Sequence, residues 1–279
     1  MNKEDFIRRY PARRPDSSKF DNGRILLVSG SYGMAGAAIL NIIGARSVGS
    51  SYIRCLLPAS IYPIVAAREV TTVYHPDPLD DPDFLPSLDV LGKVDAIAFG
   101  SGLDLHPYRK EYLAYILRDF SGPVVVDAAA FRLFAEDESL YGNSNIIMTP
   151  HLGEFAVLTG KSRSEILDDR EAIARDFASK HNVTLVLKGP GTIVTDGGRL
   201  YKNDSGNEAL ARAGSGDVLT GMICGLCSLY DDSFQAAIDG VWMHGYLCDE
   251  TVKVHAKETF DLCHYVEYAD VFFKQKDHF

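Results

Sequence analysis

The stretch 203–225 of this 279-residue chain reads NDSGNEALARAGSGDVLTGMICG. At its centre, residues 214–217 (GSGD) precede apolar residues spaced for one face of a helix: Val218, Met222, Leu226 and Leu229. A glycine-flanked turn that runs into a helix leaves unpaired backbone N–H groups at the positive end of the helix dipole. The pattern therefore predicts a site for an anion such as a phosphate group.

Asp217 has two interpretations that the residues alone leave open. A carboxylate repels phosphate, so Asp217 can simply be the N-cap of the helix, where aspartate is a favoured residue. Alternatively, it faces a hydroxyl that loses its proton while a phosphoryl group, held by the glycine amides, is transferred to it.

The composition is that of a globular protein, with 46% hydrophobic and 24% charged residues. A net charge of −10 disfavours binding to a nucleic-acid backbone or an anionic membrane surface. The first residues lack the apolar segment of a secretory signal, and no apolar run is long enough to span a membrane. We expect a cytoplasmic protein.

The five cysteines are scattered along the chain. Cys224 and Cys227 have CxxC spacing, but they fall inside the apolar helix and no second pair of cysteines or histidines accompanies them. Buried free thiols in a reducing compartment are the favoured interpretation.

Short apolar runs alternate with helical patterns over most of the chain. They predict strands over 24–30, 52–57, 94–100, 123–127, 145–148 and 183–188, with helices over 31–49, 106–120 and 164–181. A hairpin over 192–195 and 199–202 and three further helices follow, and residues 1–22 read as an amphipathic lead-in. No linker or repeat divides this pattern. We expect one α/β domain over 1–279 with a mostly parallel sheet.

Glycine-rich or polar segments follow most of these strands directly. In an open α/β sheet, ligands bind outside the carboxyl ends of the strands, so these segments are expected to meet at one edge. The functional site is therefore assembled from across the sequence.

The segment after the first strand has glycines at 30, 33 and 36. This is GxxGxxG rather than the GxGxxG of a dinucleotide-binding fold, and the next strand does not end in an acidic residue. The small residues Gly36, Ala37 and Ala38 suit a helix start that lies close to a ligand or a strand.

Residues 188–192 read KGPGT and follow a strand. They are not a Walker A loop, which has another spacing and precedes a helix. A tight turn with a surface lysine and a contact to nucleotide phosphate or ribose are both open interpretations.

Residues 149–154 read TPHLGE, with His151 and Glu154 at a predicted helix start. Thr149 or His151 is a candidate cap, with Glu154 in the first turn, and a structural role for the histidine is open. Asp127, at the end of a strand, either holds a magnesium-bound water or caps the next helix. No GxSxG, HExxH or reactive-cysteine context is present.

Together these segments resemble the ribokinase-like superfamily, and within it the NAD(P)H-hydrate dehydratases. The segments that carry the resemblance are GSYGMAGAAIL (30–40), FGSGL (99–103), VVVDAAAF (124–131), NIIMTPHLGEFAVLTG (145–160), VLKGPGTIVTDG (186–197), GNEALARAGSGDVLTGMICGL (206–226) and VWMHG (241–245). They follow the order of that family and cover most of the chain.

The resemblance implies a three-layer α/β/α fold and the repair of hydrated NADH and NADPH. In that scheme ADP, or ATP in some relatives, phosphorylates the hydroxyl of the damaged ring, and elimination of phosphate restores the cofactor. It implies Asp217 as the base, an anion hole at Gly214, Ser215 and Gly216, and a homotetramer that uses Mg²⁺ through ligands the sequence does not identify. Substrate contacts are implied at Ala37, Gly102, His151 and Asp217, and nucleotide contacts at Lys188, Gly189, Pro190, Gly191, Thr192 and Gly216.

The chain departs from the family pattern at several points. It has GSGL for GPGL, TPHLGE for TPHPGE, DAAAF for DAxAL and ARAGSGD for ATGGTGD. The lost prolines are expected to change loop rigidity, and Arg212 to add a charge near the phosphates. The epimerase domain that some relatives carry is not expected in this chain.

Two other functions remain as alternatives. One is a kinase of the same fold that acts on a vitamin-precursor alcohol; Gly36, Ala37 and His151 favour a bulkier dinucleotide substrate. The other is a nucleotide sensor without catalysis, which gains nothing from a carboxylate beside phosphate.

Overall fold

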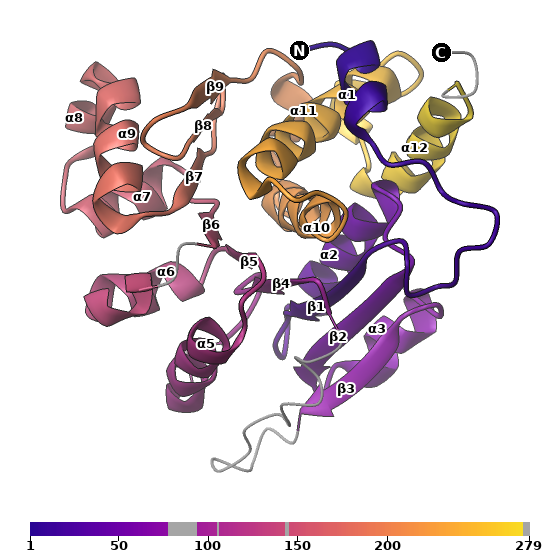
Figure 1. The fold of residues 1–279 in the computed structure, drawn as a ribbon, viewed down its shortest axis with the longest axis horizontal. Coiled ribbons are helices and arrows are strands. Elements are labelled where there is room, and N and C mark those ends of the chain that lie inside the picture. Colours follow the sequence, from indigo (N-terminus) through magenta and orange to yellow (C-terminus); the bar gives the residue numbers. More distant parts are fainter. Residues whose placement is uncertain (78–93, 105, 143–144, 276–279) are drawn as a thin grey trace.

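In the computed structural model of the protein, the described residues are 1–77, 94–104, 106–142 and 145–275. Their strands form one nine-stranded sheet in the order β3-β2-β1-β4-β5-β6-β7-β8-β9 (Figure 1). The strands are β1 (Arg24–Val28), β2 (Tyr52–Pro58), β3 (Val73–Asp77), β4 (Ala96–Phe99), β5 (Val124–Val126), β6 (Ile146–Met148), β7 (Thr184–Leu187), β8 (Ile193–Thr195) and β9 (Leu200–Lys202). All pairs from β3 to β7 are parallel, whereas β8 and β9 are antiparallel.

Helices cover both faces of the sheet, which gives the three layers that the resemblance implied (Figure 1). On one side lie α1 (Lys3–Arg9), α2 (Ala35–Ser47), α3 (Tyr62–Arg68), α10 (Ser215–Cys227), α11 (Ser233–Thr251) and α12 (Tyr265–Lys274). On the other lie α5 (Pro107–Asp119), α6 (Ala130–Glu136), α7 (Leu152–Thr159), α8 (Arg163–Asp168) and α9 (Arg170–His181).

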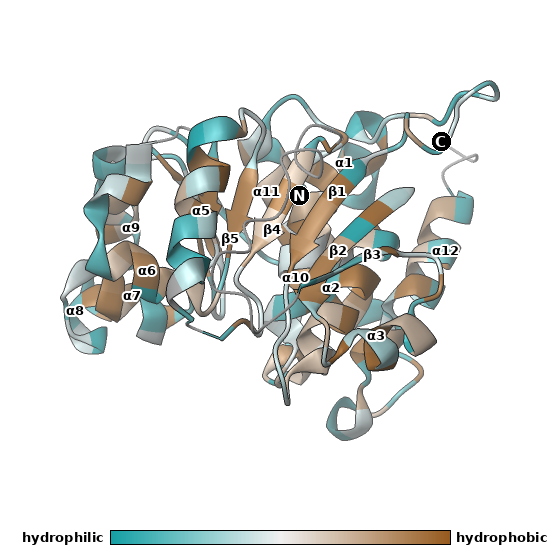
Figure 2. Cartoon of the chain, turned by 90° about the horizontal axis from the view of Figure 1, so that it is seen from below, coloured by the Kyte–Doolittle hydropathy of each residue, from teal (hydrophilic) through white to brown (hydrophobic). Residues whose placement is uncertain are grey.

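The alternation of side chains along the strands divides the interior into two cores. Ile25 and Leu27 of β1 face the core that contains α2 and α10, while Leu26 and Val28 face the core beneath α5. The central strands β1, β4 and β5 are mainly hydrophobic and lie among helices such as α5 and α9 that carry hydrophilic residues (Figure 2). The α/β prediction is therefore confirmed.

Several local predictions need correction. The strand β3 and the helix α3 were not predicted. The expected single helix over 164–181 is two helices, α8 and α9, because the backbone breaks at Asp169. The other predicted strands, the β8–β9 hairpin and the helix over 106–120 are present within a few residues of the expected bounds.

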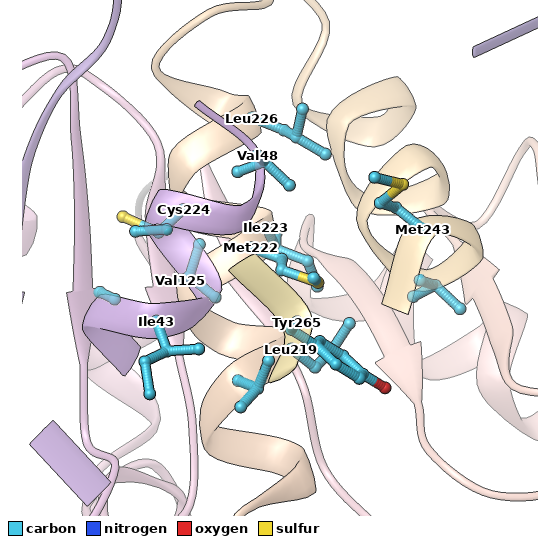
Figure 3. Close-up of a cluster of buried hydrophobic side chains, with 14 of the residues drawn as sticks. Ile43, Val48, Val125, Leu219, Met222, Ile223, Cys224, Leu226, Met243 and Tyr265 are labelled. Carbon is cyan, nitrogen blue, oxygen red and sulfur yellow. The ribbon is translucent and has the colours of Figure 1, made fainter. Parts of the chain in front are cut away.

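The crossing of α2 and α10 is unusually close. A Cβ on Gly44 would lie 2.1 Å from the carbonyl oxygen of Val218, and one on Gly221 would lie 2.0 Å from that of Asn41. Glycine at both positions therefore lets the two backbones touch. Around the crossing, Ile43 of α2, Val48 at the C-cap of α2, and Met222, Cys224 and Leu226 of α10 belong to one buried cluster (Figure 3).

All five cysteines of the described chain are free thiols, as expected. Cys55, Cys224, Cys227 and Cys248 are buried, and Cys263 is half-buried. Burial raises the pKa of the Cys55 thiol to about 12. The described residues contain no group of three or more histidine, cysteine or acidic side chains that could hold a metal ion. They also contain no helix with the length and apolar character needed to cross a bilayer.

Candidate active site

A cavity of about 870 Å³ opens beside the carboxyl ends of the central strands. The segments that line it follow β5, β6, β7 and β9, and the start of α10 completes it. The lining residues are Asp127, Ala128, His151, Lys188–Thr192, Asn203–Glu208, Leu210–Arg212, Gly214–Asp217, Leu219, Val241, His244 and Gly245. The prediction that post-strand segments meet at one edge is confirmed for the segments after β5, β6 and β7, whereas those after β1 and β4 do not line the cavity.

The helix α10 begins two residues earlier than Asp217. Gly214 is its N-cap, with φ of 90°, in the left-handed region that favours glycine. A Cβ there would also lie 2.3 Å from the side chain of Leu40. Asp217 is thus the third helical residue, and the interpretation of Asp217 as the cap is wrong. The amides of Ser215, Gly216 and Asp217 are in the first turn, where N–H groups have no partner within the helix.

The Asp217 carboxyl group titrates near neutrality. Burial raises its pKa to about 7, and repulsion from Asp127 acts in the same direction. Lys188 and a hydrogen bond with Ser101 oppose these effects only in part. A carboxylate with a pKa near the working pH is suited to take a proton from a hydroxyl.

Lys188 is a half-buried cation in the cavity wall rather than a surface lysine, so the surface interpretation is wrong. Its side chain is 18% exposed, and Nζ donates to Asp127 Oδ1 at 2.9 Å. Burial lowers its pKa, but the charges of Asp127 and Glu154 outweigh burial and hold the pKa above its ordinary value. A Cβ on Gly216 would lie 3.1 Å from Nζ, so the ammonium group lies directly against the start of α10.

Asp127 is buried and fully engaged by hydrogen bonds. Its Oδ1 accepts from Thr149 Oγ1 at 2.9 Å as well as from Lys188, and Oδ2 accepts from Ser101 Oγ at 3.0 Å. Burial would raise its pKa, but Lys188 and these hydrogen bonds lower it overall. It does not cap α6, whose N-cap is Ala129 without a side-chain hydrogen bond, so that interpretation is wrong.

This environment bears on where Mg²⁺ can be held. Direct ligation by Asp127 would compete with a lysine and two hydroxyl donors. The donor set therefore does not fit an all-protein magnesium site. Mg²⁺ prefers octahedral oxygen ligands and commonly keeps waters beside substrate phosphates.

The KGPGT segment is a turn built around two glycines. Gly189 has φ of 143° and Gly191 φ of 60°, which side chains with a Cβ rarely adopt. Arg170 of α9 donates to the carbonyl oxygens of Leu187 at 2.9 Å and Pro190 at 2.8 Å. These bonds fix the turn on the cavity wall. The Thr192 hydroxyl donates to the carbonyl of Gly189 at 2.9 Å.

His151 is the N-cap of α7, which confirms it, rather than Thr149, as the cap. Its Nδ1 accepts from the Glu154 amide at 3.0 Å, and Glu154 Oε2 accepts from the His151 amide at 2.8 Å. The imidazole is nevertheless 59% exposed and lines the cavity. Because Nδ1 accepts, the neutral ring carries its proton on Nε2, which lies 3.6 Å from Glu154 Oε1.

Ala37 and Gly102 do not line this cavity. They touch each other instead: a Cβ on Gly102, whose φ is 63°, would lie 2.5 Å from that of Ala37. They connect to the site through Ser101, which interacts with both Asp127 and Asp217. Ser101 stands where the family pattern has proline, so this departure adds a hydrogen-bond donor beside the two carboxylates.

Arg212 lines the cavity, but its guanidinium is occupied. It donates to the carbonyl oxygens of Ala209 and Lys257, both at 2.9 Å, and lies 4.9 Å from the ring centre of Phe260. The departure from the family pattern therefore anchors the 203–214 segment to the C-terminal part of the chain.

Sequence reasoning missed two residues of α11: His244, which lines the cavity, and Asp249, which holds two lining residues. His244 Nε2 lies 3.4 Å from Ser215 Oγ, and burial lowers its pKa to about 4, so the ring is neutral. Asp249 accepts from the Gly206 amide at 2.8 Å and from Asn207 Nδ2 at 2.7 Å. VWMHG marked the neighbourhood of His244 in the sequence, but no local pattern connects Asp249 to residues more than 40 positions away.

The comparisons with known proteins agree with this geometry. A family model described as NAD(P)H-hydrate dehydratase matches residues 25–269. A bifunctional NAD(P)H-hydrate repair enzyme Nnr of Moorella thermoacetica is 33% identical over 93% of this chain and 51% of its own length. An ADP-dependent (S)-NAD(P)H-hydrate dehydratase of Neisseria meningitidis is 34% identical over 86% of this chain and 81% of its own length. The chain thus spans about half the length of the bifunctional relative.

Solved structures show the same fold. An ADP/ATP-dependent NAD(P)H-hydrate dehydratase of Bacillus subtilis, co-crystallised with ATP and Mg²⁺, superposes with a TM-score of 0.85 at 26% identity, covering 99% of this chain and 97% of that one. A ribokinase-like superfamily protein of Enterococcus faecalis superposes with a TM-score of 0.87 at 21% identity, covering 99% of this chain and 95% of that one. This similarity supports the fold alone.

Proposed function

Because this chain belongs to the NAD(P)H-hydrate dehydratase family, we propose that it restores NADH and NADPH from the S-epimer of their hydrates. ADP is the proposed co-substrate, with ATP as an alternative donor, and AMP and phosphate are the products with ADP. The observation that carries the proposal is Asp217, a carboxylate with a pKa of about 7 in the first turn of a helix and beside Lys188.

The proposed reaction has two steps. Asp217 takes the proton of the ring hydroxyl while the hydroxyl oxygen bonds to the terminal phosphorus of ADP. AMP leaves with the electrons of the broken P–O bond. The new phosphate ester then leaves with the electrons of the ring C–O bond, and the adjacent carbon loses a proton. The hydrate thereby loses the elements of water, which end in the AMP and phosphate formed from ADP, and the ring oxygen leaves as part of the phosphate.

The electrostatic environment supports these roles. We assign the transferring phosphate to the amides of Gly214, Ser215 and Gly216, where the helix dipole and Lys188 stabilise negative charge. Nucleotide contacts are proposed for Lys188, Gly189, Pro190, Gly191, Thr192 and Gly216, and substrate contacts for Ala37, Gly102, His151 and Asp217. Mg²⁺ is proposed to bind through the nucleotide phosphates, where it would neutralise charge, rather than through a cage of protein ligands.

The wider setting is proposed from the same family membership. The chain is proposed to act as one domain over 1–279, in the cytoplasm and as a homotetramer. Its net charge of −10 gives no support to a nucleic-acid or membrane partner.

The test is incubation of the protein with hydrated NADH, ADP and Mg²⁺ while the absorbance of the dihydronicotinamide is followed. Recovery of absorbance, with AMP and phosphate formed in equal amounts, is expected. Phosphorylation of a vitamin-precursor alcohol by ATP without any recovery would instead establish a kinase. Binding of ADP without turnover of either substrate would indicate a sensor.

A further inference from the structure

A hydrogen bond joins the middle of α2 to the first turn of α10. The side-chain amide of Asn41 donates from Nδ2 to the backbone carbonyl oxygen of Asp217 at 2.7 Å. Asn41 is 1% exposed, and it lies 176 positions from Asp217 in the sequence. Burying an amide costs free energy unless it is hydrogen-bonded, and here one bond goes to the backbone of the proposed base.

The backbones of the two helices leave this bond little freedom. A Cβ on Gly221 would lie 2.0 Å from the carbonyl oxygen of Asn41, and one on Gly44 would lie 2.1 Å from that of Val218. The helices therefore touch backbone to backbone on either side of the hydrogen bond. Close packing fixes the distance between the helices, while the directional hydrogen bond resists rotation of α10 about its own axis.

The same face of α2 also borders the proposed substrate side. Ala37 lies four residues before Asn41, one helical turn away, and contacts Gly102. Ser101, the neighbour of Gly102, donates to Asp127 at 3.0 Å and also lowers the pKa of Asp217. Consecutive turns of one helix thus hold the proposed substrate contact and the proposed base.

Rotation of α10 matters because the reacting carboxylate lies away from the helix axis. A rotation of about 15° moves a group about 5 Å from the axis by roughly 1.3 Å. A misplacement of about 1 Å at a reacting group can cost on the order of 10²-fold in rate. We propose that Asn41 is a positioning residue whose amide fixes the direction in which Asp217 points toward the hydroxyl. This proposal rests on the proposed function, in which Asp217 acts as the base.

The decisive variant is Asn41→Leu, which keeps a similar volume and removes the donor. Asp217 keeps its helical N–H partner, so no buried acceptor is orphaned. We expect kcat to fall by about tenfold or more, while KM for ADP and for the hydrate stays within about twofold, because the amide acts on orientation. An unchanged kcat would overturn the proposal.

Ser47→Ala is the matched control on the same helix. Ser47 is also 1% exposed, and its hydroxyl donates to the Ile43 carbonyl at 2.8 Å, so the control removes a buried hydrogen bond that does not reach α10. Equal losses of kcat in both variants would mean general destabilisation and would contradict the proposal. If Asn41→Leu does not fold, Asn41→Ser, whose hydroxyl is too short to reach the carbonyl, replaces it with the same expected outcome.

A second readout separates this proposal from the proposed function. The Asp217 carboxyl is titrated by carbon NMR in the wild type and in Asn41→Leu, Asn41→Asp and Ser47→Ala, without substrate. We expect the titration midpoint to move in both Asn41 variants, upward for the added carboxylate of Asn41→Asp, and to stay unchanged in the control. A wild type that fails to dehydrate hydrated NADH would remove the proposed function, whereas unmoved midpoints would remove the role of Asn41.

Discussion

At the scale of single residues, the role of Asp217 is the first to test. Asp217→Asn keeps the shape of the side chain and removes its ability to accept a proton. We expect turnover to fall by on the order of 10²–10⁴-fold, the usual contribution of a positioned base, with the affinity for ADP little changed. Isothermal titration with ADP and a dehydration assay on the same preparation check the two halves of this expectation. Near-normal turnover would exclude Asp217 as the base.

The pKa of Asp217 also predicts a pH dependence. The base acts only when deprotonated, so kcat/KM should rise about tenfold per pH unit below a pKa of about 7 and level off above it. His244, with a pKa of about 4, stays neutral around pH 7 and cannot produce this rise of kcat/KM with pH. Burial also raises the pKa of Glu154, which pairs with the cavity residue His151, so Glu154→Gln should retain the rise of kcat/KM with pH. If Glu154→Gln lost the rise of kcat/KM with pH, the rise would have to be assigned to Glu154 instead of Asp217.

The sequence was sufficient to place Asp217 and Lys188 at one edge of the sheet but not to describe their surroundings. A glycine-rich turn before an apolar helix is a local pattern, so the helix start and the carboxylate near it could be predicted, while the anion site remains a prediction. Whether Asp217 caps the helix depends on where the first turn begins, and Gly214 decides that through its left-handed backbone. The contact with Asn41 has no local signal, because it exists only after two distant helices pack.

At the scale of secondary-structure elements, the crossing of α2 and α10 is expected to tolerate no added side chain. Gly221→Ala places a methyl group 2.0 Å from a backbone oxygen, so the helices must separate. We expect a loss of about 1–3 kcal/mol in the free energy of unfolding, measured by chemical denaturation.

Gly36→Ala is the control for this substitution. Gly36 is in α2, and a Cβ there would have no neighbour within 4 Å. Its effect on stability should stay within about 1 kcal/mol and favour the folded state, since alanine is the better helix former. Equal destabilisation by both substitutions would contradict the importance of the crossing.

The elements that sequence patterns missed lie at the edge of the sheet. The strand β3 reads VYHPD and has only its last residue buried, so it lacks the apolar run that revealed the central strands. Proline is tolerated there because an edge strand has an unpaired side. The central strands, buried on both faces, are continuous apolar runs and were therefore predictable.

At the scale of the whole molecule, ADP should stabilise the fold because the cavity is formed by segments from across the chain. A ligand present at about 100 times its Kd adds about 2.7 kcal/mol to the free energy of unfolding. We expect Lys188→Met to lose most of this increment, since a charge-assisted contact with phosphate is removed. The measurement is the change in melting temperature caused by ADP, relative to each variant without nucleotide. Lys253→Met, at an exposed lysine, should respond like the wild type.

The buried cysteines allow unfolding to be followed without an engineered probe, because their thiols react only when they become accessible. A thiol-specific reagent attacks only accessible thiolate, and in the native state burial raises the pKa of Cys55 to about 12 and that of Cys248 to about 11. Cys263, half-buried in the native fold, should therefore react first. Cys224 and Cys227, both buried residues of α10, are expected to become reactive only when α10 loses its packing. Mass spectrometry after timed labelling would then measure the labelling rate of each cysteine, and with it the rate at which the helices that carry Asn41 and Asp217 separate.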